Sequence, residues 1–251
     1  MRNPIVFEVN SNHQVASIHF ESVPDGCDYM DIVWGIEESL ARVEESSEIR
    51  VVHLSSQCEN FLPDRVIMES TVPSKIGLLS RLISGIALPT VAHVTNNAFG
   101  VGLEIVLCAD VRICSWDSKF TMNQVKDGFI PHEGGTQRLP RVVGIGRALE
   151  LILTGRVFDA REALEMGLVQ YVSEQNDTGG TTAESVLEAI CKAGPVATKY
   201  FKEAVKSGSD MSLRDGLVLE TDLNVILQST SDRAEGIASF MEKRLPKFTG
   251  E

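Results

Sequence analysis

Two short segments carry the side chains in this sequence that are best suited to move protons. One is residues 128–144, "GFIPHEGGTQRLPRVVG", where His132 and Glu133 stand side by side between a proline and a glycine pair. Imidazole and carboxylate groups are the usual general acids and bases of enzymes. Pro131 fixes one backbone dihedral, and the glycines permit close approach of another group. The alternative is a plain turn in which both side chains are solvated and Thr136 caps the following helix.

The second segment is residues 96–110, "NNAFGVGLEIVLCAD", where Gly100 and Gly102 precede an apolar helical stretch that carries Glu104. The first N–H groups of a helix have no intrahelical partner and can stabilise a developing oxyanion. Glu104 would be the one charge in the first turns of a buried helix. It serves there either as a partner for the helix dipole or as a catalytic carboxylate.

Other chemical constellations are missing from the sequence. His13, His19, His53 and His93 have no metal-like spacing, and the five cysteines include no CxxC pair. Neither GxSxG, nor a Walker A motif, nor a Rossmann GxGxxG is present. The sequence therefore predicts no metal site and no bound cofactor.

The bulk properties limit the class of protein. The chain has 251 residues, 43% of them hydrophobic, and a formal net charge of −12. That charge argues against a general nucleic-acid binder, which needs clustered Lys and Arg. The N-terminus has no apolar core of signal-peptide length, and no apolar run reaches about 18 residues. These properties predict a cytoplasmic protein with no membrane contact.

Strand-like and helix-like segments alternate in the first part of the chain, which favours an α/β fold with parallel pairing. The predicted strands are 5–9, 15–20, 49–55, 90–95, 111–115, 119–123 and 168–173. The predicted helices among them are 31–46, 72–86, 102–110, 147–155 and 159–167, the last with Asp159 as N-cap and Gly167 as C-cap. Four more helices are predicted at 183–194, 196–208, 213–229 and 231–245. The chain thus divides into a core of residues 1–180 and a helical region of residues 181–251.

Three segments together resemble the enoyl-CoA hydratase/isomerase (crotonase) superfamily. They are "LPTVAHVTNNAFGVGLEIVLCADVRIC", "GFIPHEGGTQRLPRVVGIGRALELILTGRVFDAREALEMGLVQYV" and "SDRAEGIASFMEKRLPKFTG". The likeness covers roughly residues 85–251. It implies a spiral of ββα units with a helical C-terminal region that builds homotrimers or hexamers made of two trimers. It also implies an acyl-CoA substrate, whose thioester carbonyl two backbone N–H groups polarise while glutamates move protons.

Carried over residue by residue, the resemblance assigns several roles. Glu104 matches the first family glutamate, and Val101 matches the glycine whose N–H forms half of the oxyanion hole. Phe240 and Lys243 fall in the tail that lines the coenzyme A pocket, where Lys243 would contact a phosphate. The glycine and proline positions that match the substrate-binding motifs are Gly100, Gly128 and Pro131. Coenzyme A would enter only as part of the substrate.

The sequence departs from the family at two points. The second family glutamate is replaced by Gln124, which can form hydrogen bonds but cannot transfer a proton at ordinary pH. The loop that supplies the other oxyanion-hole N–H is "FLPDRV", residues 61–66, and it places Pro63 at the donor position. Because proline has no N–H, Leu62 or Asp64 would have to donate instead.

These departures leave several hypotheses open. In the first, Glu133, with or without His132, replaces the missing acid and pairs with Glu104. In the second, Glu104 alone shuttles protons, as an isomerase can; in the third, the chain is catalytically silent. The leading functional prediction is hydration, dehydration or isomerisation of an unsaturated acyl-CoA through an enolate. The alternative is a hydrolase of the same fold that cleaves a β-diketone without coenzyme A.

Overall fold

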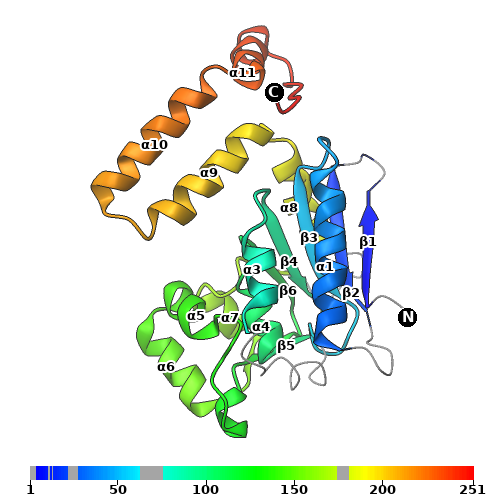
Figure 1. Cartoon of the computed structure of the whole chain (residues 1–251), viewed down its shortest axis with the longest axis vertical. Helices are drawn as coiled ribbons and strands as arrows, with labels where there is room; N and C mark the ends of the chain where they lie inside the picture. Colours follow the sequence, from blue (N-terminus) through cyan, green and yellow to red (C-terminus); the bar gives the residue numbers. More distant parts are fainter. Residues whose placement is uncertain (1–3, 11, 13, 22–27, 63–75, 174–180) are drawn as a thin grey trace.

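The computed structural model of the chain describes residues 4–10, 12, 14–21, 28–62, 76–173 and 181–251. Its core is a mixed α/β fold, and helices alone make up the C-terminal region (Figure 1). This architecture confirms the predicted α/β fold with a helical C-terminal region.

A six-stranded sheet forms the centre of the core. In spatial order its strands are β1 (Ile5–Val9), β2 (Val15–Phe20), β3 (Val51–Ser56), β4 (Thr90–Val94), β6 (Val111–Ser115) and β9 (Tyr171–Ser173). The β1–β2 hairpin is antiparallel, and every later pair in the sheet is parallel. Parallel strands need a crossover between them, and the helices that follow β2, β3 and β4 provide these crossovers.

Both faces of the sheet are covered, which explains why its strands are hydrophobic on both sides. One face packs against α1 (Tyr29–Glu44), α3 (Leu78–Ser84) and α4 (Val101–Val106) to form the main hydrophobic core. The other face packs against α8 (Thr181–Cys191). Within the described residues the predicted helix at 72–86 corresponds to α3, whose N-cap is Gly77 with φ of 72° and whose C-cap is Gly85; residues 72–75 lie outside the described part.

A smaller sheet lies beside α4 and supports the segments with the predicted chemistry. Its strands are β5 (Asn97–Phe99), β7 (Lys119–Thr121) and β8 (Phe158–Asp159). The 3₁₀ helix η2 (Gln124–Asp127) follows β7, and it leads to α5 (Gly135–Val143), α6 (Ile145–Thr154) and α7 (Ala160–Glu165). The carboxylate of Asp159 caps α7, as predicted, by accepting a hydrogen bond from Glu162 N at 2.9 Å.

Two predicted helix ends differ in detail. At α7 the C-cap is Met166, and Gly167 with φ of 76° is the next residue. The prediction that Thr136 caps α5 is wrong, because Gly134 occupies the N-cap and makes no side-chain hydrogen bond. Gly134 has φ of 95°, in the region where L side chains are strained, and this conformation favours glycine.

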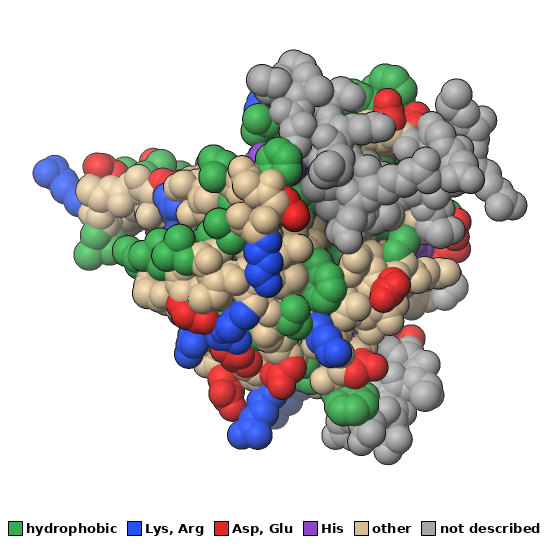
Figure 2. All heavy atoms as spheres, turned by 90° about the horizontal axis from the view of Figure 1, so that it is seen from below, with side chains coloured by type: hydrophobic (Ala, Val, Ile, Leu, Met, Phe, Trp, Pro, Cys, Tyr) green, Lys and Arg blue, Asp and Glu red, His purple; other side chains and the backbone are tan. Residues whose placement is uncertain are grey.

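The last three helices extend away from the sheet (Figure 1). They are α9 (Pro195–Gly208), α10 (Leu213–Leu227) and α11 (Ser231–Glu242). Lys202 joins α9 to the core through an ion pair with Asp110 at 2.7 Å. Large apolar side chains remain exposed on these helices, and Figure 2 shows hydrophobic groups gathered along the protruding side of the molecule. In the described part of the chain, no helix combines the length and apolar character needed to cross a bilayer.

Candidate active site

Glu104 lies at the centre of the segments singled out in the sequence. It stands in the first turn of α4 and is fully buried, with a relative exposure of 0%. Its Oε1 accepts a hydrogen bond from Gln124 Nε2 at 2.7 Å. Its Oε2 accepts two more, from Glu133 N at 2.7 Å and Gly135 N at 2.8 Å. The start of α4, η2 and the start of α5 are thus joined by one carboxylate.

Burial raises the pKa of Glu104 to about 7, and the hydrogen bonds from Gly135 and Glu133 N–H reduce the rise. Removing a carboxylate from water disfavours its charged form, whereas N–H donors and a helix N-terminus favour it. Here desolvation is the larger effect. A carboxyl group with a pKa near neutrality can both accept and return a proton, which is the property a general acid–base needs.

Gln124 is the immediate neighbour of this carboxylate. Its amide nitrogen donates a hydrogen bond to Glu104 Oε1. Its own Oε1 is buried and has no hydrogen-bond partner among the described residues. A buried acceptor without a partner costs roughly 1–3 kcal/mol. Such an atom is well suited to bind a water molecule or a hydroxyl group. Gly100 precedes α4 with φ of 53°, a conformation that favours glycine, and Gln124 Nε2 lies 3.7 Å from where its Cβ would be, an ordinary contact distance.

Gly135 lies against the Glu104 side chain and leaves no room for a Cβ. A Cβ at Gly135 would lie 2.9 Å from Glu104 Cγ and 3.0 Å from Pro131 Cβ. The glycine therefore lets the α5 backbone approach close enough to donate its N–H to the carboxylate. Pro131 is buried beside it and shapes the same turn.

Glu133 is also fully buried, but its carboxylate is occupied by other elements. Its Oε1 accepts a hydrogen bond from Tyr29 Oη, and its Oε2 accepts one from Ser80 N at 2.9 Å. The structure therefore connects Glu133 to Glu104 through the Glu133 N–H rather than through the two carboxylates. His132 is half-buried, and burial lowers its pKa while the nearby Glu133 opposes the change.

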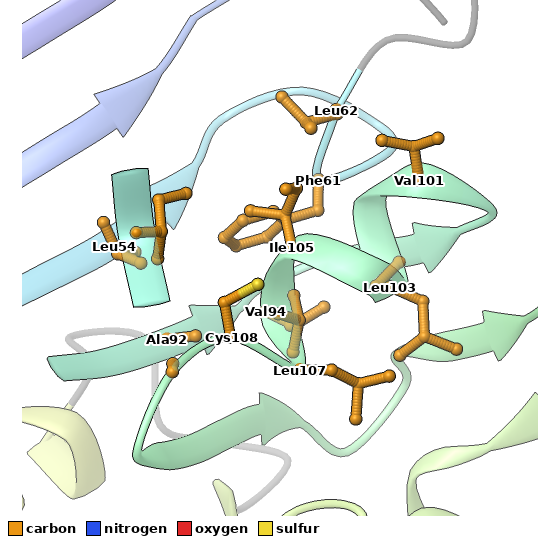
Figure 3. Close-up of a cluster of buried hydrophobic side chains, with 14 of the residues drawn as sticks. Leu54, Phe61, Leu62, Ala92, Val94, Val101, Leu103, Ile105, Leu107 and Cys108 are labelled. Atoms are coloured by element: carbon orange, nitrogen blue, oxygen red, sulfur yellow. The ribbon is translucent and has the colours of Figure 1, made fainter. Parts of the chain in front are cut away.

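The predicted oxyanion-hole residues lie next to each other. Val101 is the first residue of α4, and both Val101 and Leu62 are buried. A Cβ on Gly102 would lie 3.2 Å from Leu62 N, so the backbones of the two segments are in contact. Figure 3 shows Leu62 and Val101 above the apolar side chains that fix α4 against the sheet. Pro63 and Asp64 lie outside the described residues.

α4 is held in place by its apolar side chains. Leu103 and Ile105 are 0% exposed, and burying each contributes about 1.5–3 kcal/mol. Figure 3 shows these side chains among those of neighbouring elements, including Phe61 and Val94. Glu104 is therefore a single charge on a rigid, apolar helix.

Three residues predicted to bind substrate are exposed and lie outside the buried cluster around Glu104. Gly128 ends η2 with φ of 78° and is exposed. Phe240 is 85% exposed on α11, and Lys243 is exposed at its end. α11 lies at the other end of the long axis of the molecule from α4 and α5 (Figure 1). Within one chain, Phe240 and Lys243 therefore do not approach Glu104.

Sequence reasoning missed two groups at this site. Tyr29 lies two residues before the predicted start of its helix, at Asp31, and nothing in the local pattern distinguishes it from an ordinary core aromatic. The N–H of Ser80 is a backbone donor, which no motif can reveal. Both become visible only when α1 and α3 pack beside the loop that contains Glu133.

Comparison with known proteins points to one family. The family model described as enoyl-CoA hydratase/isomerase matches residues 32–251. Mitochondrial methylglutaconyl-CoA hydratase of Rattus norvegicus is 38% identical over 229 residues, covering 86% of this chain and 73% of that protein. Mitochondrial enoyl-CoA hydratase domain-containing protein 2 of Mus musculus is 34% identical, covering 85% of this chain and 77% of that protein.

Solved structures agree with this result. The crystal structure of enoyl-CoA hydratase from Bacillus anthracis superimposes with a TM-score of 0.88 at 30% sequence identity. The superposition covers 99% of this chain and 100% of that one. The fold and its connectivity are therefore shared over the full length.

Proposed function

Because the chain belongs to the enoyl-CoA hydratase/isomerase family, we propose that it hydrates an enoyl-CoA thioester, or dehydrates the hydroxyacyl product, with one carboxylate as its acid–base group. It is an enzyme of the hydratase/isomerase type that acts on an acyl-CoA, as its relatives are named. The observation that carries the proposal is that Gln124 Nε2 donates to Glu104 Oε1 at 2.7 Å while Gln124 Oε1, beside it, is a buried acceptor without a partner among the described residues.

The thioester carbonyl would bind at the start of α4. The Val101 N–H stands at the first position of the helix, where no intrahelical acceptor exists for it. Leu62 N is the second donor in this proposal, because the α4 backbone lies against it. Two such donors stabilise the enolate oxygen that forms when a nucleophile adds to the β-carbon.

The water molecule would bind between Glu104 and Gln124. One of its hydrogens is donated to Gln124 Oε1, which otherwise has no partner in the described structure, and the other faces Glu104. Glu104 takes this second proton as the water oxygen bonds to the β-carbon. The protonated Glu104 then returns the same proton to the α-carbon as the enolate collapses. One carboxylate with a pKa near 7 thus serves as base and then as acid.

A second candidate reaction is double-bond isomerisation, and the replacement of the second glutamate by Gln124 favours it. A single base can remove a proton from the α-carbon of a β,γ-unsaturated thioester and return it to the γ-carbon without a water molecule. The same oxyanion hole stabilises the dienolate in that reaction. The two reactions differ in whether the product contains a new hydroxyl group.

The test is to give the purified protein three substrates: crotonyl-CoA, a β,γ-unsaturated hexenoyl-CoA and acetylacetone. Formation of hydroxybutyryl-CoA supports hydration, and a conjugated hexenoyl-CoA product supports isomerisation. Cleavage of acetylacetone without thioester turnover would contradict the acyl-CoA proposal and favour the β-diketone hydrolase. Glu38→Gln, on the exposed side of α1, is a matched control for Glu104→Gln, which should lose turnover.

We also propose that copies of the chain assemble, as homotrimers or as hexamers of two trimers, and that the coenzyme A pocket includes residues from another copy. The separation of Phe240 and Lys243 from Glu104 within one chain supports this arrangement. So do the exposed apolar side chains of the last helices, such as Phe201 at 72% and Leu213 at 81%. Light scattering on the purified protein gives its mass directly, and a monomer that turns over its substrate would contradict the proposal.

A further inference from the structure

Glu133 occupies an unusual place for a carboxylate, because every polar group of the residue is bound within the protein. Its side-chain oxygens accept hydrogen bonds from Tyr29 Oη and Ser80 N, the latter at 2.9 Å. Its carbonyl oxygen accepts one from Arg138 Nη1 at 2.8 Å. Its N–H donates to Glu104 Oε2 at 2.7 Å. The carboxylate is 0% exposed, as is that of Glu104, but its contacts lie toward α1 and α3 and not toward Gln124.

These contacts link three elements that are far apart in the sequence. Tyr29 is the first residue of α1, and Ser80 is the third residue of α3. The N-cap of α3, Gly77, has no side-chain oxygen, so the Glu133 carboxylate satisfies a free N–H at that helix end. Tyr29 Oη also accepts a hydrogen bond from Leu79 N at 3.2 Å. The pair of Tyr29 and Glu133 therefore binds two N–H groups in the first turn of α3.

We propose that Glu133 is a positioning residue: its buried carboxylate, anchored to α1 and α3, fixes the backbone N–H that holds the carboxylate of Glu104. The predicted effect of Glu133 on turnover rests on the proposed function. Its predicted effect on the position and ionisation of the Glu104 carboxylate does not. Glu133 then takes no part in proton transfer. The sequence suggests a catalytic role for Glu133; in this proposal the residue acts only through Glu104.

The direction of the effect follows from the hydrogen bonds. The N–H groups of Glu133 and Gly135 favour the charged form of Glu104 and oppose the rise in its pKa, whereas the negative charge of the Glu133 carboxylate adds to that rise. Tyr29→Phe weakens the connection of the loop to α1 but keeps the Glu133 charge, so the two N–H groups are less well directed. The pKa of Glu104 should therefore rise further in Tyr29→Phe, and the acid limb of the pH–rate profile should move to higher pH. Glu133→Ala also removes the charge, so its two effects on this pKa oppose each other.

Three substitutions separate a positioning role from a catalytic one. Glu133→Gln keeps a carbonyl for the Ser80 N–H and an amide that can donate to Tyr29 Oη, but it cannot transfer a proton. Glu133→Ala removes both contacts, and Tyr29→Phe removes one donor while keeping the ring. We expect Glu133→Gln to retain kcat within about threefold, and Glu133→Ala to lose about tenfold or more in kcat with little change in KM. Tyr29→Phe, which keeps the Glu133 charge, should move the acid limb of the profile to higher pH.

A titration without substrate keeps the inference testable if no acyl-CoA is turned over. The 13C resonance of the Glu104 carboxyl group, assigned by its loss in Glu104→Gln, reports the pKa of this residue directly. Absence of turnover in the wild-type protein would count against the proposed function alone, whereas the titration decides the positioning role. A higher Glu104 pKa in Tyr29→Phe, which keeps the Glu133 charge, with Glu38→Gln as an unchanged control, supports it.

Two results would overturn the inference. One is a Glu133→Gln protein that is folded, with a Glu104 pKa no higher than that of the wild type, but is as inactive as Glu104→Gln, since Glu133 would then move protons itself. The other is an unchanged titration of Glu104 in Tyr29→Phe together with wild-type kcat in Glu133→Ala, since the loop would then hold Glu104 without the anchor. If Glu133→Ala does not fold, Tyr29→Phe and Glu133→Gln decide the question.

Discussion

Glu104→Gln gives the most quantitative test of the electrostatic environment of the site. In the folded protein, burial raises the pKa of Glu104 from 4.5 to about 7. In the unfolded chain, the same carboxyl group loses its proton near its ordinary pKa. Between these two values the folded state binds more protons than the unfolded state, so its stability falls as pH rises. Gln has no proton to lose and does not contribute to this slope.

The size of the effect follows from the two pKa values. At about 1.36 kcal/mol per pKa unit, the difference between 4.5 and about 7 corresponds to roughly 3 kcal/mol of unfolding free energy. The unfolding free energy of Glu104→Gln minus that of the wild type should therefore be larger at pH 8 than at pH 4 by about 3 kcal/mol. The substitution itself can be accommodated, because Gln124 can rotate its amide and use its unpartnered oxygen to accept from the new amide.

The assay is chemical denaturation of the wild type, Glu104→Gln and the control Glu38→Gln, at one protein concentration and several pH values between 4 and 8. The unfolding free energy of Glu104→Gln minus that of the wild type should increase as pH rises, while Glu38→Gln runs parallel to the wild type. A difference that does not change with pH would refute the raised pKa. A difference that decreases as pH rises would mean that the three hydrogen bonds to the carboxylate outweigh its burial.

Three further predictions test other parts of the structure. Gly135→Ala, whose Cβ would lie 2.9 Å from the Glu104 side chain, should lower kcat about a hundredfold while circular dichroism shows an unchanged helix content. Lys202→Met removes a 10% exposed cation from Asp110 and should lower the unfolding free energy by about 2–3 kcal/mol, against less than about 1 kcal/mol for Lys206→Met. Burial lowers the pKa of His53 to about 3, so below pH 6.5 the unfolded chain takes up a proton that the folded protein does not, and the unfolding free energy falls. His53→Asn should reduce this loss of unfolding free energy between pH 7 and pH 4 by about 3 kcal/mol.

Much of the fold could be predicted because its strands and helices carry strong local patterns. β1, β2 and β6 match the predicted ranges to the residue, since runs such as "VASIHF" are short, mostly apolar and bounded by the polar residues Gln14 and Glu21. α9 starts at Pro195 and ends at Gly208, where the sequence contains a helix-starting proline and a small terminal residue. The start of α5 was harder, because the glycine conformation at Gly134 excludes the cap expected from Thr136.

The candidate site was only partly predictable. Glu104 and Gln124 could be placed together because they match the two glutamate positions of the family that the sequence resembles, and the structure shows Gln124 Nε2 2.7 Å from Glu104 Oε1. The direction of the Glu133 side chain could not be predicted, since it depends on Tyr29 and on a backbone N–H of α3. Sequence spacing fixes a neighbourhood, while tertiary contacts decide which atoms of a residue face the site.

The central claim is that Glu104 alone transfers protons on an enoyl-CoA thioester. The most direct measurement is the rate of crotonyl-CoA and β,γ-unsaturated hexenoyl-CoA conversion by the wild type, Glu104→Gln and Glu133→Gln in one buffer at neutral pH. The account predicts that Glu104→Gln loses turnover by about a thousandfold or more, while Glu133→Gln stays close to the wild type. Retained turnover in Glu104→Gln, together with its loss in Glu133→Gln, would contradict it.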